Sequence, residues 1–189
     1  MKHVKNALAI SALLGATFFS FNAIAADTVV NNSISHQDVL KAQQAWVDAL
    51  IKISQTYEKQ GHAAAKTLAQ QVLDQAYGYK QGAVLFKPTL ASGEKTFRTD
   101  SAGALSYFVG KNSDYPLDTG FALKDWQQFS FNNAAVYLNG DIALTMGHVK
   151  VTNSKGQETL VDKSWAFKKD EQGNLRIVLH HSSLPYQAN

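Results

Sequence analysis

The fold class follows from a β-hairpin in residues 129–152, which read FSFNNAAVYLNGDIALTMGHVKVT. Its first arm, Phe129 to Leu138, carries the aromatic and β-branched residues that strands favour. Asn139-Gly140 is a two-residue signal typical of a type I′ hairpin turn. In the second arm, Ile142 to Thr152, larger side chains alternate with small ones. The stretch therefore predicts two antiparallel strands joined by a tight turn.

Two more strands are expected after this hairpin. Following a glycine-containing turn, Thr159 to Lys168 has Val161, Trp165 and Phe167 at even spacing. Because successive strand residues point to opposite faces, these three side chains are expected on one face. After a further turn, Leu175 to Ser183 gives the last strand. The second half of the chain is therefore expected to be a run of antiparallel strands.

Two amphipathic helices are expected before the sheet. Ser35 and Asp38 are placed as an N-cap and its acidic partner, and apolar residues then recur at helical spacing through about Tyr57. Gly61 separates this helix from a second one over Ala63 to Ala76. The first third of the chain is therefore expected to be helical.

Shorter elements are expected in the middle of the chain. Val84 to Phe86 reads as a short strand stopped by Pro88, and Ser101 to Val109 as one or two turns of helix. The aromatic residues expected in the core are Phe86, Phe97, Phe108 and Phe121. Helices followed by hairpins predict an α+β fold with N-terminal helices packed on one face of a strongly curved antiparallel sheet. Such a sheet leaves a pocket between its concave face and the helices.

The N-terminus reads as a secretory signal peptide over residues 1–25. Lys2 and Lys5 precede an apolar run, and Ala23-Ile24-Ala25 offers the small-x-small cleavage pattern. The apolar run, Ala7 to Phe21, is shorter than the roughly 20 residues that span a bilayer. We expect cleavage after Ala25, a periplasmic location, and no stable membrane anchor afterwards. Residues 26–189 are then expected to form a single domain.

Charge and composition exclude several classes of function. The chain of 189 residues has 18 basic and 15 acidic residues, and removing Lys2 and Lys5 leaves the rest near neutral. A near-neutral surface gives no electrostatic support for nucleic-acid binding. There is no cysteine, which excludes disulfides, thiolate metal ligands and thiol nucleophiles. The sequence motifs of P-loop, zinc-protease and serine-hydrolase sites are also absent.

One dense polar cluster remains, His180-His181-Ser182-Ser183, at the end of the last strand. Alternation predicts that His180 and Ser182 share one face, while His181 and Ser183 share the other with Ile177 and Leu179. The two histidines therefore cannot easily bind one ion, and a catalytic zinc would need a further ligand such as His148. The ordinary alternative is one packed and one solvated histidine.

The closing strand, together with several stretches before it, resembles a known protein family. This resemblance covers nearly all of the chain after residue 25. The stretches that carry it are Leu175 to Tyr186, Tyr77-Gly78-Tyr79, Val84 to Thr89, Ala104 to Val109 and Gly120 to Leu123. In order and spacing they resemble the iota-class carbonic anhydrases, within the superfamily of nuclear-transport-factor-2-like (NTF2-like) and kinase-association-domain-like proteins. The resemblance implies a cone-like α+β barrel, often a homodimer, that interconverts carbon dioxide and bicarbonate.

Carried over residue by residue, the resemblance places the pocket's catalytic side chains at Thr89, Tyr107, His180 and Ser182. No metal is expected to be required, with zinc or manganese as the alternative. The three hydroxyls would then orient water and stabilise bicarbonate, and His180 would accept or relay the proton. Each residue also has an ordinary role: Thr89 in a turn, Tyr107 in the core, His180 as a structural histidine, and Ser182 at a strand end.

The sequence is also compatible with other functions. Lys87 and Arg98 could attract an anion, although solvated charge is the usual role of such residues. A non-catalytic periplasmic module of the same superfamily, for binding a small ligand or for dimerisation, would have the same fold. A different hydrolase or isomerase would need a carboxylate in the pocket, and Asp162 is the candidate.

Overall fold

The computed structural model describes residue 31 and residues 33–188, so the predicted signal peptide and its cleavage site lie outside the described residues. Within the described part, the elements follow the predicted order. The helices are α1 (His36–Gln60), α2 (His62–Ala76) and α3 (Ser101–Val109). The strands are β1 (Leu85–Lys87), β2 (Trp126–Asn139), β3 (Ile142–Asn153), β4 (Glu158–Lys169) and β5 (Leu175–Ser183). None of the helices described is long and apolar enough to cross a membrane.

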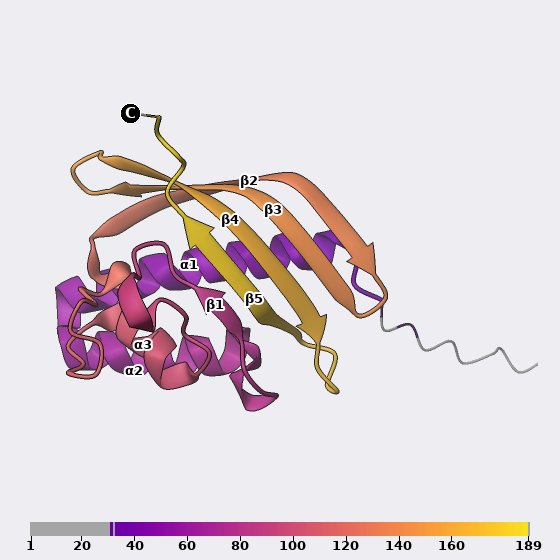
Figure 1. Ribbon diagram of the computed structural model, residues 1–189, viewed down its shortest axis with the longest axis horizontal. Helices are drawn as coiled ribbons and strands as arrows, with labels where there is room; N and C mark the ends of the chain where they lie inside the picture. The colour runs from indigo at the N-terminus through magenta and orange to yellow at the C-terminus, as the bar shows by residue number, and fades with distance from the viewer. Residues whose placement is uncertain (1–30, 32, 189) are drawn as a thin grey trace, which may run out of the picture. The chain divides into compact units, whose positions relative to one another are not determined.

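The strands form one curved sheet in the order β1-β5-β4-β3-β2 (Figure 1). Neighbouring strands from β2 to β5 pair antiparallel, as predicted. The short β1 differs from the prediction, because it pairs parallel to β5 at the sheet edge. The segment before α3 covers the other side of β1, where the Arg98 amide donates to the Phe86 carbonyl. The expected α+β class is confirmed, with a mixed sheet rather than a purely antiparallel one.

The helices begin and pack as their sequences indicate. Ser35 and Asp38 form the predicted capping box, in which each side chain accepts a hydrogen bond from the other residue's amide. The side of α1 that carries Trp46, Val47 and Leu50 is buried. This helix contacts α2 and strand β2, and in Figure 1 it runs behind the strands. The helices thus bury the inner face of the sheet and enclose the core.

The hairpin between β2 and β3 has a different turn from the one predicted. Asn139 pairs with Ile142, so the two loop residues are Gly140 and Asp141. Of these two, Gly140 has a positive φ of 57°, whereas Asp141 does not. A positive φ at the first loop position alone is the pattern of a type II′ turn, so the predicted type I′ turn is wrong.

A bulge in β2 depends on the absence of a side chain at Gly147. The register between β2 and β3 shifts between Asn133 and Ala135, next to this glycine. A Cβ atom on Gly147 would lie 2.1 Å from the Asn132 carbonyl oxygen, too close for any other residue. Bulges increase the local bend and twist of a strand, so Gly147 permits part of the curvature that closes the sheet around the helices.

Three of the four phenylalanines expected in the core are buried, and Phe97 is not. The Phe97 side chain is 69% exposed, and the prediction for this residue is wrong. The reason lies in the extended segment before α3, where neighbouring residues point in opposite directions. Arg98 points inward and is buried, so Phe97 points out beside the exposed Leu85 of β1.

Candidate functional site

The predicted alternation along β5 holds at the polar cluster. His180 and Ser182 are buried, whereas His181 is exposed and Ser183 is half-buried. The prediction for Ile177 is wrong, because Ile177 is buried rather than on the outer face. A register shift between β4 and β5 leaves one extra residue in β5 between Ile177 and Leu179, which reverses the alternation there. His180 and Ser182 therefore face the core together, as the sequence indicated.

Aromatic rings enclose the His180 imidazole on several sides. It stacks on Phe86 of β1, its parallel neighbour, with ring centroids 4.6 Å apart. Trp46 of α1 contacts it edge-on at 5.4 Å, and Trp165 of β4 lies at 5.8 Å. Burial among these rings, together with the nearby Lys163, holds the pKa of His180 well below its usual value. The imidazole is therefore neutral at physiological pH.

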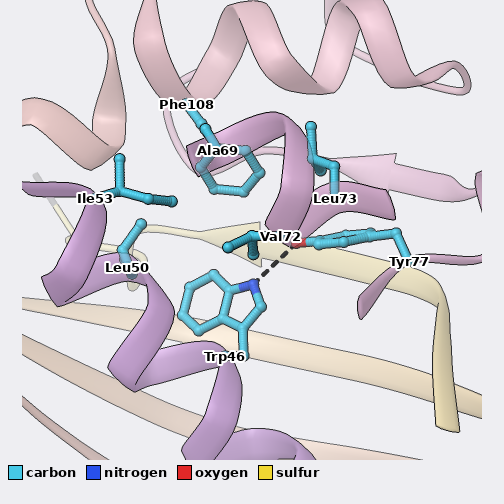
Figure 2. A pocket seen from close by; sticks show the side chains of 8 residues that line it. All are labelled: Trp46, Leu50, Ile53, Ala69, Val72, Leu73, Tyr77 and Phe108. Carbon is cyan, nitrogen blue, oxygen red and sulfur yellow. Dashed lines mark hydrogen bonds between the residues drawn. The ribbon is translucent and has the colours of Figure 1, made fainter. Parts of the chain in front are cut away.

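A chain of hydrogen bonds fixes which nitrogen of His180 carries its proton. The Trp46 indole N–H donates to the Tyr77 hydroxyl at 2.9 Å (Figure 2), and that hydroxyl lies 2.8 Å from His180 Nδ1. An indole N–H is only a donor, so within the described residues Nδ1 is the acceptor left for the buried Tyr77 O–H, which therefore donates to it. Neutral His180 then carries its proton on Nε2. Burial raises the pKa of Tyr77 well above its usual value, so the phenol keeps its proton.

Two polar side chains lie on the Nε2 side of His180. The Lys163 Nζ atom is 2.9 Å from Nε2, and the Ser182 Oγ atom is 3.2 Å from it. Lys163 and Ser182 are partners in the register between β4 and β5. The Ser182 carbonyl also accepts a hydrogen bond of 2.8 Å from Lys87 of β1. The inner face of β4 and β5 thus supplies a compact polar group inside an aromatic core.

Lys163 is the residue at this site that the sequence analysis missed. Its side chain is 5% exposed, and desolvation lowers its pKa to about 7. The signal was present in the sequence: Lys163 has even spacing with Val161, Trp165 and Phe167, the three residues predicted to share a face. All four are buried on the same side of β4. A lysine at an inward position of an alternating strand was a sufficient clue.

The other two predicted site residues form a separate pair. Tyr107 of α3 is buried, and its hydroxyl makes no well-formed hydrogen bond within the described residues. Thr89, in the turn after β1, lies next to this hydroxyl, and burial raises the pKa of Tyr107. Tyr107 contacts the edge of Phe86 at a centroid distance of 5.8 Å. Phe86 therefore touches Tyr107 and also His180, although no hydrogen bond joins the two pairs in the described structure.

The small cavity in Figure 2 lies beside this hydrogen-bonded chain and is apolar. Its volume is about 10 Å³, and it is lined by Trp46, Leu50, Ile53, Ala69, Val72, Leu73, Tyr77 and Phe108. A larger open pocket of about 220 Å³ between α1, α2 and the sheet shares Trp46 and Val72 with it. The predicted pocket next to the concave face is thus present, but none of the four predicted catalytic residues lines either space.

The structure contradicts the roles suggested for His148 and Asp162, because both residues lie on the outer face of the sheet. His148, named as a further zinc ligand, pairs with Asp162 at 3.2 Å, and both side chains are exposed. They lie on the face of the sheet opposite His180, so His148 cannot join a metal site there. Asp162 for the same reason does not supply a carboxylate to the core. Over the described residues, no group of three or more histidine, aspartate or glutamate side chains is placed to hold a metal ion.

Arg98 is neither solvated nor free to attract an anion. It is buried and makes a bidentate ion pair with Asp118, at 2.9 and 3.0 Å. Ser106 of α3 donates to the same carboxylate, and Tyr115 packs over the guanidinium at 4.3 Å. This ion pair ties the loop before α3 to the loop after it and has no part in the polar group around His180.

Comparisons with known proteins agree with this architecture. A protein of Nostoc sp. (strain PCC 7120 / SAG 25.82 / UTEX 2576), called "Metal-independent carbonic anhydrase", is 54% identical over 159 residues, or 84% of this chain and 78% of the relative. The crystal structure of the iota-carbonic anhydrase from a cyanobacterium, complexed with bicarbonate, has a TM-score of 0.85 and 52% identity, covering 86% of this chain and 99% of that one.

A more distant structure shares the fold alone. It is a putative calcium/calmodulin-dependent protein kinase II association domain from Xanthomonas campestris, 17% identical, with a TM-score of 0.55 and coverage of 85% of this chain and 95% of that one. The family described as metal-independent carbonic anhydrase matches residues 37–184, which is most of the chain. On this match and the 54% identical relative, the chain belongs to the metal-independent carbonic anhydrase family.

Proposed function

We propose that this protein interconverts carbon dioxide and bicarbonate without a metal ion. Family membership supports the reaction, and so does the close likeness to a structure complexed with bicarbonate. The observation in this chain that carries the proposal is the buried polar group of His180, Ser182 and Lys163 among aromatic rings. Apolar walls suit carbon dioxide, and hydrogen-bond donors in a low-dielectric site stabilise the charge that develops as bicarbonate forms.

Thr89, Tyr107 and Ser182 are proposed to orient water and to bind bicarbonate oxygens. The buried Tyr107 hydroxyl beside Thr89 supports this role, because a buried donor that makes no well-formed hydrogen bond among the described residues calls for a ligand or a water molecule. His180 has a different role from the one expected. Its lowered pKa makes it a poor acceptor for a proton, whereas its Nε2–H group is well placed as a donor. His180 therefore holds the polar group in position and donates a hydrogen bond.

The activity is tested by stopped-flow carbon dioxide hydration with protein that has been treated with chelator and assayed for residual metal. We expect hydration well above the buffer background, unchanged by the chelator and by added zinc or manganese. No hydration in either condition would overturn the proposal and would favour the non-catalytic binding module. Activity that depends on added metal would overturn the metal-free reaction alone.

The secretory leader and a periplasmic location are also proposed for this protein. The support is the pattern of Lys2, Lys5 and Ala23-Ile24-Ala25 in the sequence. Intact mass measurement on protein recovered from the periplasm of an expressing bacterium is expected to give a chain that begins at Ala26. Recovery of the full-length chain in the cytoplasm would contradict both proposals.

We further propose that two copies pair through the outer face of the sheet. Large apolar side chains lie exposed there, near the hairpin of β2 and β3: Tyr137, Ile142, Leu144 and Met146. Such a patch is typical of an interaction surface. In sedimentation velocity, the protein is expected to be a dimer and Met146→Lys a monomer. A monomeric parent protein, or a variant that still dimerises, would contradict the pairing.

A further inference from the structure

We propose that the Lys163 amine is the proton acceptor of the hydration reaction, taking the proton that leaves the attacking water molecule. This inference rests on the proposed function and adds a catalytic residue to it. Among the described residues, the surroundings of Lys163 hold no counter-ion. Every ion pair in the described residues lies elsewhere, and none includes Lys163.

The hydrogen bonds around His180 determine the form of the Lys163 side chain. Trp46 donates to Tyr77, Tyr77 donates to Nδ1, and the imidazole proton is therefore on Nε2. An ammonium group has no lone pair and cannot accept from Nε2–H. At 2.9 Å from Nε2, the Nζ atom is therefore the uncharged amine, whose lone pair accepts from Nε2–H at rest and must exchange this bond for the proton of water during the reaction. Desolvation, which lowers the pKa of Lys163 to about 7, acts in the same direction.

On protonation, Lys163 gives up the hydrogen bond from Nε2–H, and the nearby aromatic rings stabilise the charged form instead. The Nζ atom lies 4.3 Å from the centroid of the Trp46 ring and 5.2 Å from that of Trp165. The faces of indole rings attract a cation. Ser182, the cross-strand partner of Lys163, offers a hydroxyl oxygen at the same place. The ammonium ion is thus stabilised by two rings while the amine is stabilised by the lack of water, which is the balance that a base needs near neutral pH.

The groups that face Lys163 come from each neighbouring element. They are Trp46 from α1, Trp165 from its own strand, and His180 and Ser182 from β5, with Lys87 of β1 bound to the Ser182 carbonyl. His180 and Lys87 are the two titratable members. Neither is a carboxylate that could hold the ammonium form permanently.

The hydration step needs only water, carbon dioxide and the Lys163 amine. A water oxygen forms a bond to the carbon of carbon dioxide, and one carbon–oxygen π pair moves to oxygen. The water O–H bond breaks, and its proton moves to the lone pair of Nζ. The products are bicarbonate and the Lys163 ammonium ion, which returns its proton to solvent or buffer before the next turnover. Lys163 thereby performs the deprotonation that a metal ion assists in other enzymes of this reaction type.

The decisive experiment compares two substitutions by stopped-flow hydration from pH 5.5 to 9. Lys163→Met keeps the length of the side chain and removes the base, while Lys163→Arg keeps a positive charge that is not lost in this range. We expect kcat to fall on the order of 10²–10⁴-fold in both. The parent kcat/KM is expected to rise through an apparent pKa near 7, and this rise is expected to vanish in both variants.

The controls distinguish a failure of the proposed function from a failure of the role assigned to Lys163. Lys168→Met removes an exposed lysine from the same strand and is expected to keep the parent rate and pH profile. Circular dichroism and melting temperature establish that the Lys163 variants fold. Addition of small primary amines to Lys163→Ala is expected to restore part of the rate. If the parent protein is inactive, the proposed function fails; if the parent is active and Lys163→Arg matches it, only the role of Lys163 fails.

An NMR experiment distinguishes a base from a nucleophile. A neutral lysine can also attack carbon dioxide to give a carbamate, with release of a proton. With ¹³C-labelled carbon dioxide, we expect no carbamate signal that depends on Lys163. A carbamate on Lys163 formed at the rate of turnover would overturn its role as proton acceptor.

Discussion

The two faces of β5 place the same residue types in opposite environments. His180 and Ser182 are 2% and 1% exposed, while their neighbours His181 and Ser183 lie on the outer side. On the inner side, the histidine contacts four aromatic rings, and its pKa is held well below the usual value. Burial and partners, rather than residue type, therefore give this site its chemistry.

The largest difference is expected between the two histidines. His180→Ala removes an imidazole from between Phe86, Trp46 and Trp165 and leaves Lys163 without its partner. We expect kcat to fall on the order of 10²-fold or more and the free energy of unfolding to fall by about 2–5 kcal/mol. Hydration kinetics on the folded fraction and urea denaturation measure the two effects.

His181→Ala is the matched control for that substitution. Its side chain is exposed, and surface substitutions usually change stability by no more than about 0.5 kcal/mol. Equal losses in the two variants would mean that the inner and outer faces do not differ in function.

A smaller difference is expected between the two serines. Ser182→Ala removes the hydroxyl next to His180 Nε2 while the strand keeps its backbone bonds. We expect kcat/KM to fall about 10- to 100-fold, because one donor to developing negative charge is lost. Stopped-flow hydration measures this, with Ser183→Ala on the outer face expected to stay within about twofold of the parent. A Ser182→Ala variant with full activity would remove Ser182 from the site.

The last difference concerns stability as a function of pH. In the folded protein the pKa of Lys163 is lowered from 10.5 to about 7, so between these values the unfolded chain binds more protons at this residue. The Lys163 contribution to the free energy of unfolding therefore rises with pH across this window, by at most about 1.4 kcal/mol per pH unit. Below pH 7 the full cost of the buried charge remains.

Urea denaturation at pH 7, 8, 9 and 10 tests this slope. Lys163→Met is expected to lose the slope that Lys163 contributes, and Lys168→Met is expected to keep it. His180 contacts Lys163, so the difference in slope between the two variants reports the coupled pair. Parallel curves for the two variants would show that Lys163 is charged in the folded protein throughout this range.

Much of the fold was predictable because it depends on neighbours in the chain. The Ser35 cap, the bounds of α3 and those of β5 follow from spacing and turn residues, which act over a few positions. The pairing of His180 with Ser182 follows from the period of two along a strand. Where a bulge interrupts that period, as it does beside Ile177, the same reasoning fails.

The sequence by itself determined the family, the order of elements and the inward face that carries His180 and Ser182. Only the tertiary structure decided what those side chains meet. Trp46, Tyr77 and His180 are separated by 31 and 103 residues along the chain, yet they form one line of hydrogen bonds. Local periodicity sets the direction of a side chain, but its pKa depends on the water it loses and on the distant groups packed against it.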